Sequence, residues 1–243
     1  MPTPDIAKVE AAIVQLTNVF RKEQGLAAVQ PNVVLRKAAE DFARYLARTG
    51  TFSHTADGRQ PGERAKAAGY DFCIVSENLA SNLDSRGFET NQLARDAVEG
   101  WKGSPGHRKN MVEPNVSDIA VAVAKAQGEE KYLSVQLFGR PISQRYEFTV
   151  SNASQLPVAY SFAGRPFSIE QHRIITHTEC VPGMLSFVSA GRWLTKQTLT
   201  ASFPISPGAG FLIEPAKNAG TVIVRAVKSG PPKSEAAPAP GKR

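Results

Sequence analysis

Apolar residues in the first half of the chain repeat every three or four positions, a spacing that places them on one face of a helix. The first such stripe, over residues 6–20, consists of Ile6, Val9, Ile13, Leu16 and Phe20. The same period continues over residues 32–50, where Asn32 is a suitable N-cap and Gly50 a suitable stop. A short helix over 61–69 and a longer one over 89–101 are also predicted. Four helices are therefore expected before any clear strand.

The pattern then changes to strict alternation of apolar and small residues. Residues 119–123 and 132–138 alternate in this way, and the polar segment 127–130 between them is suited to a turn. Two alternating runs around a short polar turn predict a β-hairpin. Helices followed by strands favour an α+β layer over repeated βαβ units.

The second half of the chain reads as short strands only. Runs rich in β-branched and aromatic residues occupy residues 146–150, 158–162, 173–178, 184–188, 198–203 and 221–227. Turn segments at 163–166, 181–183 and 206–208 separate them, which predicts a small all-β domain resembling a sandwich. The domains expected are thus residues 1–141, residues 145–227 and a Pro/Lys/Ala-rich tail, 228–243, whose composition predicts disorder.

Composition narrows the classes of partner. No apolar run approaches the roughly 20 residues of a membrane span, so no transmembrane segment is predicted, and the first residues show no signal peptide. The formal charge is +7, but the basic residues are scattered and include no long basic block or stacking aromatic pair. Nucleic acid is therefore not expected as a partner.

The chain has two cysteines, Cys73 and Cys180, one in each predicted domain. Their spacing fits none of the common zinc or redox motifs. In an oxidising compartment they could form a disulfide that closes a loop of about 100 residues. Two buried free thiols are an equally good interpretation of the sequence.

Three short segments carry the candidate chemistry. They are residues 52–58, 76–80 and 101–111, and they contain His54, Glu77 and His107 in turn. Each of these side chains stands beside turn-forming residues, so we expect all three to be presented to one shared cleft. Two imidazoles and a carboxylate suit Zn²⁺ or another divalent cation, and nothing indicates an organic cofactor.

In order, these segments resemble the signatures of the CAP superfamily (cysteine-rich secretory proteins, antigen 5, pathogenesis-related 1; the SCP domain), in the compact form of its bacterial members. The resemblance covers about residues 6–140. It implies an α-β-α sandwich, an extracellular, periplasmic or cell-envelope location, and a cleft with two histidines and two glutamates. His54 and His107 match the two histidines, and Glu77 matches the first glutamate.

The position of the family's second glutamate is occupied here by Ser104. Glu99 is a poor substitute because it points about 140° away from Ser104 on the helix. Asn78 and Asn110 are expected to line the cleft and to bond backbone groups beneath it. Trp101 is expected in the core.

A reduced set of ligands favours binding over catalysis, because a catalytic zinc site normally has three protein ligands and a separate base. We therefore expect a secreted protein that binds a divalent cation and a ligand, lipid or cell-surface partner without turnover. Two alternatives stay open. One is a slow metal-dependent hydrolase or peptidase that uses the same three residues, and the other is a surface adhesion module that acts through the β domain.

Two other kinds of site, a serine hydrolase site and a copper site, are less well supported by the sequence. Ser53 and Ser104 lie close to the histidines, but no Gly-x-Ser-x-Gly elbow surrounds either of them, which disfavours a serine hydrolase. The β domain contains the residue types of a copper site in His172, His177, Cys180 and Met184. Their order differs from that of a blue-copper loop, so we interpret these histidines as incidental.

Overall fold

The structure of the protein is a computed structural model that describes residues 2–189, 198–217 and 221–228. It divides into two compact units, Met1–Gln144 and Arg145–Arg243. The predicted disordered tail, 228–243, lies outside the described residues except for Lys228, which ends a strand. None of the described helices is long and apolar enough to cross a membrane.

Five α-helices are described in the first unit, α1 (Ile6–Glu23), α2 (Val33–Thr49), α3 (Pro61–Ala67), α4 (Thr90–Gly103) and α5 (Pro105–Met111), and a short 3₁₀ helix, η1 (Ile142–Gln144), ends it. The first four confirm the helices predicted from the apolar stripes. The Asn32 side chain caps α2 by accepting hydrogen bonds from two backbone amides, and Gly50 ends it with a φ of 70°. The fifth, α5, was not predicted, because seven residues that begin with Pro-Gly are too few to show a stripe.

The expectation that four helices precede any clear strand is wrong. The long strand β2 (Phe72–Leu83) lies between α3 and α4, and the two-residue strand β1 (Gln30–Pro31) precedes α2. Polar residues at the centre of β2, Ser76, Glu77 and Asn78, interrupt the apolar alternation by which a strand is recognised.

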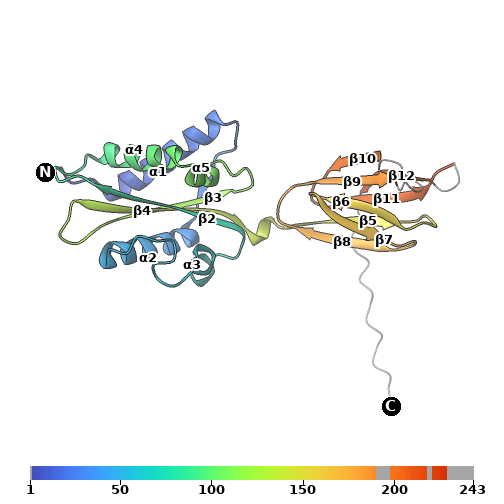
Figure 1. Ribbon diagram of the computed structural model, residues 1–243, viewed down its shortest axis with the longest axis horizontal. Coiled ribbons are helices and arrows are strands. Elements are labelled where there is room, and N and C mark those ends of the chain that lie inside the picture. The colour runs from blue at the N-terminus through green and yellow to red at the C-terminus, as the bar shows by residue number, and fades with distance from the viewer. Residues whose placement is uncertain (1, 190–197, 218–220, 229–243) are drawn as a thin grey trace, which may run out of the picture. The chain divides into compact units, whose positions relative to one another are not determined.

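The first unit is an α-β-α sandwich around one four-stranded sheet, as the resemblance implied. Its strands follow the order β1-β3-β4-β2, where β3 (Asp118–Lys125) and β4 (Lys131–Pro141) form the predicted hairpin. Within this sheet, β1 and β3 pair in parallel and the other pairs are antiparallel. Helices α1, α4 and α5 lie on one face of the sheet and α2 and α3 on the other, while β2 forms one edge (Figure 1).

Each face of this sheet has its own apolar core, because successive residues of a strand point to opposite faces. On β3, Ile119 and Val121 pack into the cluster shared with α1 and α4, whereas Ala120 and Ala122 pack into the cluster under α2. Trp101 is buried in the first cluster as expected, and its indole N–H donates to the backbone of β2.

The second unit is all-β, as predicted. It consists of two four-stranded sheets, in the orders β10-β9-β6-β7 and β12-β11-β5-β8. Its strands are β5 (Tyr146–Asn152), β6 (Val158–Phe162), β7 (Arg165–Ile169), β8 (Ile174–Glu179), β9 (Met184–Ser189), β10 (Thr198–Pro204), β11 (Ala209–Pro215) and β12 (Val222–Lys228). Side chains of both sheets share one apolar core, which confirms the sandwich.

Two of these strands, β7 and β11, were not predicted. Pro166 made β7 look like part of a turn. The strand pairs only with β6 at the edge of its sheet, where a residue without an N–H is tolerated. The strand β11 was missed although it is a central strand that pairs in parallel with β5.

The copper-type residues of the second unit do not form a metal centre. His177 is buried, its ring stacks on Phe148 at 4.7 Å, and its Nε2 lies 2.7 Å from the Tyr160 hydroxyl. Met184 is exposed. His177 is therefore a core histidine with a hydrogen-bond partner. Neither Cys73 nor Cys180 is a free thiol.

Candidate functional site

The candidate site lies along β2, at the edge of the first unit's sheet. Glu77 and Asn78 are neighbours in this strand, so their side chains point to opposite faces. Glu77 faces α2 and α3, and Asn78 faces α1 and α5. The turn-forming residues beside Glu77 predicted a presented side chain; instead Glu77 lies within a strand, and only 1% of its side chain is exposed.

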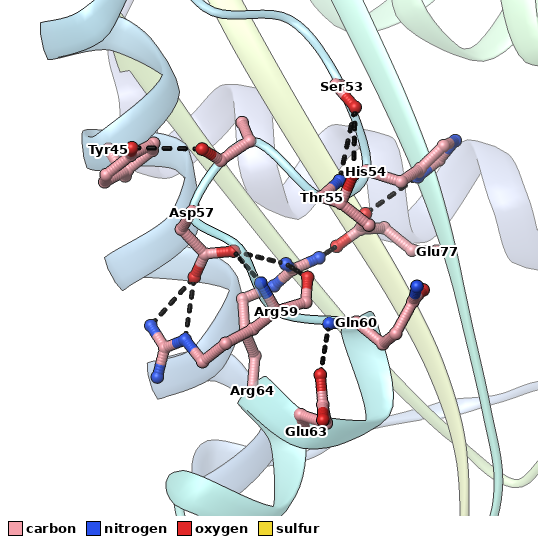
Figure 2. Close-up of polar contacts among 11 residues, drawn as sticks. Tyr45, Ser53, His54, Thr55, Asp57, Arg59, Gln60, Glu63, Arg64 and Glu77 are labelled. Atoms are coloured by element: carbon pink, nitrogen blue, oxygen red, sulfur yellow. Dashed lines mark hydrogen bonds and ion pairs between the residues drawn. The ribbon is translucent and has the colours of Figure 1, made fainter.

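His54 comes from the loop between α2 and α3 and reaches this buried carboxylate. Its Nδ1 lies 2.8 Å from Glu77 Oε1 (Figure 2). A carboxylate oxygen can only accept, so Nδ1 carries a ring proton, and in the neutral ring the lone pair is on Nε2. The ring is half exposed. His54 thus presents an oriented nitrogen with a free lone pair.

Arg64 on α3 holds the other side of the same carboxylate. Its guanidinium donates to Glu77 Oε2 at 2.7 Å, to Asp57 Oδ1 at 2.9 Å and to the Arg59 carbonyl at 2.7 Å, as Figure 2 shows. The side chain is only 3% exposed and lies over the Phe42 ring at 3.5 Å. Both oxygens of Glu77 therefore have partners, one the His54 imidazole and the other the Arg64 guanidinium.

Sequence reasoning missed Arg64. A lone arginine in a seven-residue helix has no motif around it, and no spacing links it to a glutamate 13 positions later. One signal was present in Asp57, which belongs to the same segment as His54. Asp57 pairs with both Arg64 and Arg59, so a carboxylate beside the histidine indicates a nearby cation.

Burial and charge act against each other on Glu77. Burial raises the pKa of its carboxyl above the usual value, while Arg64 and His54 hold it down. On the opposite side of the site, partial burial lowers the pKa of His107, and the neighbouring His54 lowers it further. The His107 ring therefore stays neutral to more acidic pH than a free imidazole does.

His107 lies on α5 and meets His54 past the edge of the sheet. The two ring centroids are 6.4 Å apart, and the ring planes are inclined at 55°. The structure thus brings together the two histidines that the sequence placed in separate segments. They approach from opposite faces of the sheet, because α5 packs on one face and the His54 loop on the other.

Amide side chains attach α5 to β2. Asn78 Nδ2 donates to the His107 carbonyl at 3.2 Å and to Gln136 Oε1 at 2.9 Å. Asn110 Nδ2 donates to the Glu77 carbonyl at 3.1 Å and to Asn78 Oδ1 at 2.9 Å. These bonds agree with the expected structural role of both asparagines, and they fix the position from which His107 projects.

Ser104, which occupies the position of the family's second glutamate, adds no metal ligand. Ser104 is the N-cap residue of α5, and its side chain makes no capping hydrogen bond. Glu99 is exposed and pairs with Lys102 at 2.7 Å. Within the described residues, no group of three or more His, Cys, Asp or Glu is arranged to hold a metal ion. The site thus offers two imidazoles and a carboxylate that is already engaged.

Comparison with known proteins matches the first unit to one protein family. The model of the family described as "Cysteine-rich secretory protein family", CAP, matches residues 14–138, which are 125 of the 243 residues. The uncharacterized protein YkwD of Bacillus subtilis is 29% identical over 122 residues, covering 50% of this chain and 44% of the relative. The uncharacterized membrane protein YlbC of the same bacterium is 27% identical over 127 residues, covering 51% and 34%.

The chain thus spans less than half the length of these two relatives. Among solved structures, an outer surface protein from Borrelia burgdorferi has 23% identity and a TM-score of 0.47, covering 53% of this chain and 90% of that protein.

Proposed function

Because the chain belongs to the cysteine-rich secretory protein family, CAP, we propose that its first unit is a binding module in which His54 and His107 take up a divalent cation. Solvent or a bound ligand completes the coordination. The observation that carries the proposal is the hydrogen bond of 2.8 Å from His54 Nδ1 to the buried Glu77 carboxylate, next to the second imidazole.

The residues present fit such a cation. A metal-binding imidazole commonly donates its other ring N–H to a carboxylate, which sets the tautomer and makes the free nitrogen more basic. His54 and Glu77 have this arrangement, and the lowered pKa of His107 keeps its ring available. Borderline-soft cations such as Zn²⁺ are best matched to imidazole nitrogen.

The state of Glu77 favours binding over turnover. A metal-dependent hydrolase needs a carboxylate or imidazole that is free to take a proton from water. Here both Glu77 oxygens are occupied, one by His54 and one by Arg64, in a buried position. Glu77 therefore acts by orienting His54, and with two protein ligands the cation is held weakly and exchanges.

Calorimetric titration of the full chain with Zn²⁺ near pH 7 tests this proposal. We expect saturable binding to one site in the wild type and no binding in the double variant His54→Ala/His107→Ala. The matched control is His172→Ala, which removes an exposed histidine of the second unit and should leave the affinity unchanged. Zinc binding that survives in the double variant, or its absence from the wild type, would refute the proposal.

The Glu77→Gln variant examines the role of the carboxylate separately. Glutamine keeps the shape of the side chain but removes its charge, and loss of such an orienting group typically weakens metal binding by about 10- to 100-fold. A complete loss of binding would instead make Glu77 a direct ligand. Circular dichroism of each variant shows whether the fold is retained.

We also propose that the protein works outside the cytoplasm, in the extracellular space or the cell envelope. The support is the family's description as secretory. Fractionation of the native cell, followed by immunodetection, tests this. A product confined to the cytoplasmic fraction would contradict it.

A further inference from the structure

A pocket lies at the edge of the first unit's sheet opposite to the His54–His107 site. It has a volume of about 420 Å³, which is within the roughly 300–1,000 Å³ of small-molecule sites. Its walls are apolar and come from α1 through Ala7, Ala11 and Val14, and from the start of α2 through Val33. The Val33 side chain is among the most exposed apolar groups of the described residues.

The floor of the pocket is an incompletely paired stretch of β3. Strand β1 has only two residues, and its pairing with β3 ends at Ile119. Asn32 N then donates to the Ile119 carbonyl, and farther along Val123 N donates to Glu10 Oε1 at 3.0 Å. Because strand backbone groups alternate, the N–H and C=O of Val121 face the same edge, between these two bonds. The apolar pocket therefore contains a backbone donor and acceptor.

Two carboxylates and one guanidinium lie at and beside this pocket: Glu10 and Arg36 line it, and Glu40 pairs with Arg36 from outside the lining. Arg36 pairs with Glu10 at 2.9 Å and with Glu40 at 2.7 Å, so one guanidinium faces two carboxylates. Glu10 lines the pocket and is largely buried; burial raises the pKa of its carboxyl, while the hydrogen bond from Val123 N and the charge of Arg36 hold it down. A further positive charge would be attracted here, and a negative one would be repelled.

We propose that this pocket binds a small primary ammonium with an apolar body. The apolar part packs against α1 and Val33, and the ammonium group donates to the Val121 carbonyl and to the Glu10 carboxylate. This inference is independent of the proposed cation site, because the pocket lies at the other edge of the sheet and shares no residue with it.

Titration of the full chain with three probes of equal chain length tests this inference: octylammonium, 1-octanol and octanoate. Binding is followed by calorimetry and by the NMR shifts of the Val14 and Val33 methyl groups. We expect octylammonium to bind at least about tenfold more tightly than octanol, because a hydrogen bond to a charged group is worth more than a neutral one. Octanoate should bind most weakly of the three.

Two variants locate the site. Ala11 is exposed and lines the pocket, so Ala11→Trp fills it without disturbing the core, and binding of octylammonium should be lost. The matched control is Gln15→Trp, on the same helix and outside the pocket, which should bind normally. Glu10→Gln can still accept from Val123 N, and should lower the affinity for octylammonium about tenfold with no change for octanol.

The inference is overturned if octylammonium does not bind, if octanoate or octanol binds as tightly, or if Ala11→Trp binds as well as Gln15→Trp. The His54→Ala/His107→Ala variant should bind octylammonium like the wild type. Failure of the proposed metal site and failure of this pocket are therefore distinguished by separate measurements.

Discussion

Replacing Arg64 with methionine tests whether the buried ion pairs beneath His54 stabilise the first unit. Methionine retains much of the contact with Phe42 but removes the hydrogen bonds to Glu77 and Asp57, which are 1% and 6% exposed. Removal of one partner from a buried ion pair typically costs about 3–5 kcal/mol, because the other charge stays buried without compensation. Loss of the cation–π contact with Phe42 adds about 0.5–2 kcal/mol. We therefore expect the free energy of unfolding to fall by at least about 3 kcal/mol at pH 7.

The loss should depend on pH. Burial raises the pKa of Glu77 above its usual value of 4.5, and without Arg64 the pKa rises further. A carboxyl whose pKa is higher in the folded state binds more protons there, so the stability falls as the pH rises from the unfolded-state pKa through the folded-state pKa. The cost of Arg64→Met should thus be smallest near pH 4 and larger at pH 7. Adding Glu77→Gln should recover part of the stability at pH 7.

Arg59→Met is the matched control. Arg59 pairs with the same Asp57 at 2.8 Å, but half of its side chain is exposed, so its loss should cost less than about 1 kcal/mol. Urea unfolding followed by Trp101 fluorescence, in a Trp193→Phe background, reports on the first unit. If Arg64→Met cost no more than Arg59→Met, or lost the same amount at both pH values, the reasoning from buried charge would be wrong.

Three further predictions concern other parts of the chain. Burial lowers the pKa of His177 from its usual value of 6.5, so the contribution of His177 to the stability of the second unit should be constant above about pH 6.5 and fall below it; His177→Phe should remove this dependence in urea unfolding. Asn110→Ala removes two hydrogen bonds that hold α5, which should cost about 1–3 kcal/mol and weaken zinc binding at His107 in calorimetry. A methyl group on Gly139 would lie less than 3 Å from Tyr70, so Gly139→Ala should cost about 1–3 kcal/mol and lower the melting temperature.

The sequence predicted those elements whose apolar residues recur at a regular period. Helices α1 and α2 pack a single apolar stripe on the sheet, and α2 has its cap at Asn32 and its stop at Gly50, so period and boundaries agree. The β3–β4 hairpin lies between two apolar layers and shows clear alternation. Helix α5 is held by the side chains of Asn78 and Asn110, and hydrogen bonds of this kind have no periodic signature.

The candidate site was predicted in its residues but not in its chemistry. His54, Glu77 and His107 were identified by resemblance, and the structure brings them together. The partner that decides what Glu77 does, Arg64, depends on tertiary packing of α3 against the Phe42 ring, to which no local pattern points. Both oxygens of Glu77 are thereby engaged, which supports its proposed role as an orienting group.

The positions of both histidines depend on the register of strand β2 against β4. Glu77 pairs with Leu137 of β4, and Asn78 pairs with Gln136. The side chains of these two neighbouring residues therefore point to opposite faces of the sheet. Glu77 fixes His54 from one face, and Asn78 fixes the helix that carries His107 from the other. A shift of one residue would exchange the two faces, placing the amide beside Arg64 and the carboxylate among the amides. The geometry of the site is therefore coupled to the pairing of this edge strand, and the two histidines keep their separation only while that pairing holds.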